Sequence, residues 1–98
     1  MDYLISTEFV REHGDAIAQG VQFFNYLTYC GMEHVQFGKY TNHVEIDVYC
    51  DSPEEAQEVS IISQDFLLRG WVSTIEAFLG NEPNFWLVKF QYRFASLC

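Results

Sequence analysis

The segment from His43 to Cys50 constrains the fold most, because its side chains alternate without a break. Apolar residues occupy every second position, with the others between them: Val44, Ile46, Val48 and Cys50 alternate with His43, Glu45, Asp47 and Tyr49. A period of two places one set in a core and the other in water, which is typical of an antiparallel sheet covered on one face. A weaker alternation over residues 34–40, followed by Thr41 and Asn42, predicts that the two segments form a hairpin.

Two segments carry helical patterns. Ile17, Val21, Phe24 and Leu27 recur at a spacing of three and four, which predicts a helix over residues 15–30 that ends at Gly31. Ser52, Pro53 and Glu55 form a capping box with proline at the first helical position. The apolar residues that follow predict a helix over residues 53–69, ended by Gly70.

The last third alternates again, which predicts strands over residues 71–79 and 85–95 around a turn at 80–84. Residues 3–6 form either a short strand or the lead-in to an earlier helical turn that begins at Glu8, capped by Ser6 or Thr7, and is broken at Gly14. With the strand, the order is (β)αββαββ. We therefore predict a single α+β domain over residues 1–98, a two-layer sandwich with a mainly antiparallel sheet and two helices on one face, ferredoxin-like by analogy. The expected core consists of Phe24, Leu27, Ile46, Val48, Val59, Phe66, Leu67, Val88 and Phe90.

Composition limits the classes of function and the cellular compartment that we expect. The chain has 14 acidic and 5 basic residues and a formal net charge of −9, which argues against direct binding to nucleic acid or to an anionic membrane. No apolar run approaches about 18 residues, and no signal peptide is recognisable, so we expect a cytoplasmic protein. Cys30, Cys50 and Cys98 are widely spaced and odd in number, as expected of free thiols in a reducing compartment.

The acidic residues are unevenly distributed. Seven of them, and no basic residue, lie between Lys39 and Arg69. Glu45 and Asp47 point the same way from one strand, about 6.7 Å apart, which is comparable to the phosphate spacing along a nucleic-acid strand. The predicted partner-binding residues are these two together with Tyr49, Asp51, Glu54, Glu55 and Glu58. The alternative is a solvated face kept acidic for solubility.

Other features point to chemistry only weakly. Cys30 and His34 are four residues apart, but no third group is identifiable that would orient a catalytic pair or complete a metal site. No phosphate-binding glycine motif is present, so we expect no enzyme activity, cofactor or metal. Aromatic residues are 17% of the chain and are frequent in the last strands, where they form either ordinary sheet packing or an interface with a partner or a second copy.

These observations favour a small non-enzymatic protein that inhibits or regulates a protein partner by occupying its basic surface. In size and charge, though not in any motif, the chain resembles nucleic-acid mimics and the anti-defence proteins of phages, anti-CRISPR proteins among them. Acidic residues would steer the encounter, and Tyr49 would anchor the complex. The alternative is a homodimeric, small-molecule-binding regulatory domain with a pocket between sheet and helices.

Overall fold

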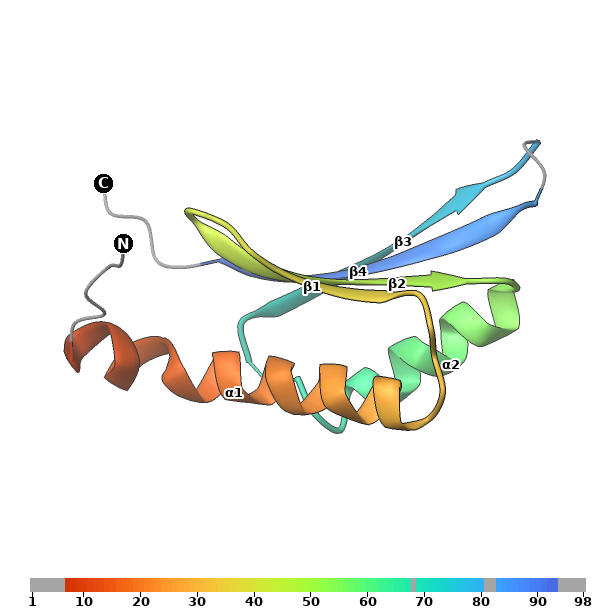
Figure 1. Cartoon of the computed structure of the whole chain (residues 1–98). Helices are drawn as coiled ribbons and strands as arrows, with labels where there is room; N and C mark the ends of the chain where they lie inside the picture. The colour runs from red at the N-terminus through yellow and green to blue at the C-terminus, as the bar shows by residue number, and fades with distance from the viewer. Residues whose placement is uncertain (1–6, 68, 81–82, 94–98) are drawn as a thin grey trace.

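The computed structural model describes residues 7–67, 69–80 and 83–93. Along the chain lie helix α1 (Thr7–Tyr29), strands β1 (Val35–Lys39) and β2 (His43–Cys50), helix α2 (Pro53–Ser63), and strands β3 (Trp71–Phe78) and β4 (Phe85–Arg93). The four strands form one antiparallel sheet in the order β1-β2-β4-β3. Both helices cover the same face of this sheet, and the opposite face is open in Figure 1. The prediction of an α+β arrangement with two helices and an antiparallel sheet is confirmed.

The expected ferredoxin-like order is wrong. That fold starts with a strand and runs βαββαβ, whereas the described chain runs αββαββ. Each helix is followed by a hairpin, and the two hairpins join through the antiparallel pair of β2 and β4. The strand optionally expected at residues 3–6 lies outside the described residues, as do the last two residues of the segment 85–95.

The alternation in β2 sets the two faces of the sheet. Its apolar residues are buried against the helices, and in the register they lie beside Trp86, Val88, Phe90 and Tyr92 of β4. The predicted strand segments agree with the structure to within one or two residues at each described end. Side chains of the other set, including Glu45 and Asp47, therefore point to the open face.

Helix α1 is longer than predicted and turns a different stripe toward the sheet. It runs through Gly14 without a break, and its buried residues include Gly20, Phe23 and Leu27. Phe23 is fully buried, whereas Phe24 and Phe66 of the expected core are only half-buried. The reason lies at Gly20, where an added Cβ would stand 2.7 Å from the Trp71 ring, so the helix meets β3 along the glycine side. The other expected core residues are buried, as predicted.

Helix α2 begins as predicted and ends early. The Ser52 side chain accepts a hydrogen bond from the Glu55 backbone N–H at 3.1 Å, which confirms the cap at Ser52. The Glu55 side chain accepts from the Asp51 backbone N–H, one residue before the N-cap position that a reciprocal capping box would use. The predicted end at residue 69 is wrong, because the helix stops at Ser63 and continues as tight turns with backbone bonds three residues apart. Phe66 and Leu67 maintain the apolar pattern from these turns, where the Phe66 ring lies 5.6 Å from that of Phe23.

Candidate binding surface

Strand β2 carries a line of polar and aromatic side chains across the open face of the sheet. His43, Glu45, Asp47 and Tyr49 are successive outward positions of the alternation that buries their neighbours. The register places Gln36 of β1 on one side of Asp47 and Lys89 of β4 on the other. The predicted residues Glu45, Asp47 and Tyr49 are thus brought together on one strand face.

Glu45 is the centre of a hydrogen-bonded network. Its Oε1 accepts a hydrogen bond from Gln91 Nε2 at 2.8 Å and lies 3.0 Å from His43 Nε2, and its Oε2 is 3.8 Å from Lys89 Nζ. Burial raises the pKa of Glu45, but the hydrogen bonds from Gln91, Asp47 and His43, with the charge of Lys89, outweigh burial and lower it to about 2. The Glu45 charge is therefore permanent near neutral pH and is largely compensated inside the protein.

Asp47, in contrast to Glu45, lacks compensating hydrogen bonds and has a raised pKa. Its Oδ1 is buried and has no hydrogen-bond partner. Burial, followed by the hydrogen bond and the negative charge of Glu45, raises the pKa of Asp47 to about 6, although Lys89 and His43 act against the shift. The two carboxylates therefore form an internal pair whose contribution to an external field is smaller than two exposed charges would give.

The remaining predicted acids cluster where β2 leads into α2. We call Asp51, Glu54, Glu55 and Glu58 the acidic end. Glu55 is used internally, because its Oε1 accepts a hydrogen bond from the Asp51 backbone N–H at 2.9 Å. Asp51, Glu54 and Glu58 are exposed, and among the described residues no lysine or arginine forms an ion pair with them.

Basic side chains gather at the opposite end of the sheet. Lys39 ends β1, Arg93 ends β4 and Arg69 precedes β3, and all three are exposed. We call these three residues the basic end. Because the strands are antiparallel, these three positions lie at the same end of the strands, opposite the end where β2 leads into α2 (Figure 1). Among the described residues, these three bases therefore lie at the opposite end of the sheet from the acidic end, although the exposed Asp15 of α1 also lies on their side, next to the residue whose carbonyl bonds to Trp71.

Aromatic rings lie beside the acidic end, on the open face. The Tyr49 and Phe85 rings are 5.8 Å apart, and Phe85 stacks on Phe78 at 4.6 Å with an interplanar angle of 10°. We call Tyr49, Phe85 and Phe78 the aromatic row. Tyr49 was predicted as an anchor, whereas its two companions were missed because they come from β4, which pairs with β2, and from β3, which pairs with β4, and neither pairing can be read from the sequence.

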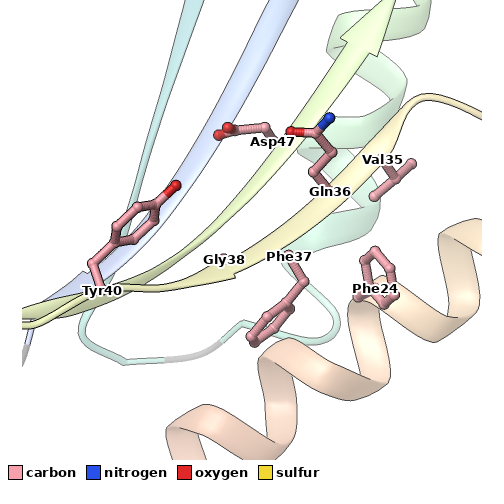
Figure 2. Close-up of a pocket in the computed structure, with 7 residues that line it drawn as sticks. All are labelled: Phe24, Val35, Gln36, Phe37, Gly38, Tyr40 and Asp47. Atoms are coloured by element: carbon pink, nitrogen blue, oxygen red, sulfur yellow. The ribbon is translucent and has the colours of Figure 1, made fainter.

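A hollow of about 560 Å³ lies along the outer side of β1. Figure 2 shows Phe24 and Phe37 on its helix side and Asp47, Gln36 and Tyr40 on the side of the open face. Its walls thus belong to both faces of the sheet. A ligand in this hollow would wrap around β1 rather than enter between the sheet and the helices.

The described residues do not assemble a metal or redox centre. No three of their His, Cys, Asp and Glu side chains are grouped so as to hold a metal ion. Cys50 is buried, and burial, followed by the charges of Glu55 and Asp51, raises the pKa of its thiol to about 11, so the thiolate is scarce near neutral pH. Cys30 is exposed, and Cys98 lies outside the described residues.

Comparison with known proteins gives no relative. The chain matches no protein-family model, no curated protein and no solved structure. Within the described part of the chain, no helix is both long and apolar enough to cross a membrane. The argument for function therefore depends on the surface itself.

Proposed function

We propose that this chain is a non-enzymatic binding protein that inhibits or regulates a protein partner by occupying its basic, nucleic-acid-binding surface. The observation that supports this proposal most is the separation of charge. Among the described residues, Asp51, Glu54 and Glu58 of the acidic end are exposed and form no ion pair with a lysine or arginine, and the basic end holds Lys39, Arg69 and Arg93. Acids kept only for solubility would more often be interspersed with bases over the whole surface.

The acidic end supplies attraction at a distance. Asp51, Glu54 and Glu58 are exposed, so their charges act through solvent on an approaching basic surface. Electrostatic complementarity of this kind acts mainly on the encounter rate and the choice of partner. Glu54 and Glu58 are four residues apart on α2, a repulsive spacing that costs the helix a few tenths of a kcal/mol. A binding role would account for this unfavourable like-charge pair.

The aromatic row supplies contact energy. Its three rings are half-buried, and in the free protein Phe85 stacks on Phe78 and lies at a tilt against Tyr49, so little side-chain entropy remains to be lost on binding. Aromatic side chains at the centre of an interface commonly carry most of its binding energy, while charged residues surround them. Glu45 and Asp47 extend this surface along β2 as an internally compensated pair.

A capture experiment with paired charge reversals tests the proposal. The test variant carries Glu54→Lys and Glu58→Lys, and the control carries Asp15→Lys and Asp65→Lys, which are exposed acids outside the acidic end. Both variants change the net charge equally. Immobilised wild-type protein, test variant and control are exposed to cell lysate at low and at high salt, and the retained proteins are identified.

The proposal expects basic nucleic-acid-binding proteins on the wild type and the control at low salt, and their loss from the test variant. Duplex DNA added in excess should displace them, because it competes for the same surface. Equal retention by both variants, or retention that duplex DNA leaves unchanged, would contradict the proposal. A small molecule that copurifies with the wild type and binds independently of salt would favour the ligand-binding alternative.

A further inference from the structure

The two free edges of the sheet differ in how they are protected. β1 has five residues and ends in Lys39, and a charged edge residue of this kind discourages pairing with another chain. β3 has eight residues, without lysine or proline, and every side chain between Trp71 and Phe78 is exposed. Figure 1 shows that β3 and β4 bend away from the helix layer toward their shared turn. β3 is thus a long, exposed edge whose one charged residue is Glu76.

The hydrogen-bond pattern identifies the backbone groups that β3 offers. The Tyr40 N–H donates to the His43 carbonyl at 2.8 Å, and the Tyr49 N–H donates to the His34 carbonyl at 3.0 Å. These bonds direct the odd-numbered residues of β2 toward β1, so the even-numbered ones bond to β4. The register of β2 and β4 pairs even-numbered residues with even-numbered ones, so the odd-numbered residues of β4 bond to the even-numbered residues of β3. The N–H and C=O groups of the odd-numbered residues Ser73, Ile75 and Ala77 therefore point away from the sheet.

We propose that two copies of this chain associate through β3, antiparallel, with Ile75 opposite Ile75 of the second copy, to form a continuous eight-stranded sheet. Ser73 then lies opposite Ala77, and all three outward residues exchange backbone hydrogen bonds with the second copy. The half-exposed Ile75 side chain (50%) contacts its equivalent on the helix side. This inference is independent of the acidic end and its partner.

The side chains of the open face select this register. Val72, which is 63% exposed, faces Phe78 of the second copy, and Glu76 faces Thr74. A slip of two residues in one direction would set Glu76 opposite Glu76, and a slip in the other would set Val72 opposite Glu76. Like charges directly opposite are destabilising, and a slip by one residue would aim the wrong backbone groups at the partner.

Charge complementarity favours a second copy over an unrelated strand. Thr74 has Lys89 as its neighbour on β4. Glu76 of the second copy therefore stands two strand spacings, about 10 Å, from Lys89 with only the small Thr74 between them.

The mass in solution tests the association. Analytical ultracentrifugation over a concentration series should give a wild-type species of twice the 11.4 kDa chain mass. Ile75→Lys, which sets two lysines face to face, should be monomeric at the same concentrations. Ile61→Lys is the matched control, because Ile61 on α2 is exposed to a similar extent (58%, against 50% for Ile75), and it should remain dimeric. A monomeric wild type at every concentration, or a dimer that survives Ile75→Lys, would overturn the proposal.

Cross-linking tests the register in a background with Cys30→Ser, Cys50→Ala and Cys98→Ser. Ile75→Cys should give a disulfide-linked dimer on oxidation, since the two thiols face each other. Ser73→Cys should not, because residues offset by four positions stand about 13 Å apart along the strands, beyond disulfide reach. Cross-linking at Ser73→Cys without cross-linking at Ile75→Cys would exclude this register.

Discussion

The carboxylate pair on β2 gives a quantitative prediction for stability. Asp47 is held beside the ionised Glu45, and its Oδ1 has no hydrogen-bond partner. Asp47→Asn removes one of the two adjacent negative charges and provides an amide N–H that can donate to Glu45. We therefore expect Asp47→Asn to be more stable than the wild type at neutral pH.

The size of the effect follows from the pKa. A rise from 3.8 to about 6 corresponds to at most about 3 kcal/mol. The carboxyl group is partly in contact with solvent, so screening reduces this to about 1 kcal/mol. Because the folded-state pKa is raised, Asp47 contributes its stability fully below pH 3.8 and loses it as the pH rises through about 6. Glu45 affects stability over a different pH range, because its pKa is lowered: its contribution to the free energy of unfolding is complete above pH 4.5 and is lost as the pH falls toward about 2.

Urea unfolding between pH 3.8 and neutrality measures the effect. The free energy of unfolding of Asp47→Asn should rise relative to the wild type by about 1 kcal/mol across this range. Asp65→Asn, at an exposed site in the turns after α2, serves as the control and should show no such trend. A difference between Asp47→Asn and wild type that is constant with pH, or an Asp47→Asn protein that is less stable at neutral pH, would refute the reasoning.

Four further substitutions test the packing of α1 and the cap of α2, each by denaturant midpoint. Phe23→Ala should cost about 3–5 kcal/mol because the side chain is fully buried, and Phe24→Ala should cost clearly less; the reverse ranking would contradict the observed helix face. Ser52→Ala should cost about 1 kcal/mol through loss of the cap, and an unchanged midpoint would mean that the cap is dispensable. Gly20→Ala should destabilise by about 1–3 kcal/mol, against the gain expected from helix propensity, because its Cβ meets the Trp71 ring; a stabilised variant would show that the ring moves aside.

Local patterns in the sequence predicted which segments form helices and strands. The end of α2 and the buried face of α1 depend on tertiary contacts and were not predicted. The alternation around Ile46 and the cap at Ser52 depend on residues within one segment, and both are found as expected. The end of α2 was misjudged because Phe66 maintains the apolar period from a turn. Phe23 was missed because the helical spacing admits two adjacent stripes, and the contact of Gly20 with β3 selects between them.

The candidate binding surface was likewise predictable only where it depends on a single segment of the sequence. The sequence places Glu45 and Asp47 on one strand face, but their unequal environments come from Gln91 and Lys89 on β4, which is far along the chain. The grouping of Tyr49 with Phe85 likewise depends on the pairing of β2 with β4. Charge counted along the chain therefore overstates the uniformity of the acidic surface.

The association rate of the captured basic partner, measured across a salt series, tests the central claim most directly. Screening shortens the range of exposed charges to about 8 Å at physiological ionic strength, so steering by the acidic end weakens as salt rises. The account predicts a steep fall in the wild-type rate, a shallow fall for the Glu54→Lys and Glu58→Lys variant, and a fall close to that of the wild type for the Asp15→Lys and Asp65→Lys control. Equal slopes for the two variants would show that the acidic end has no special part in binding.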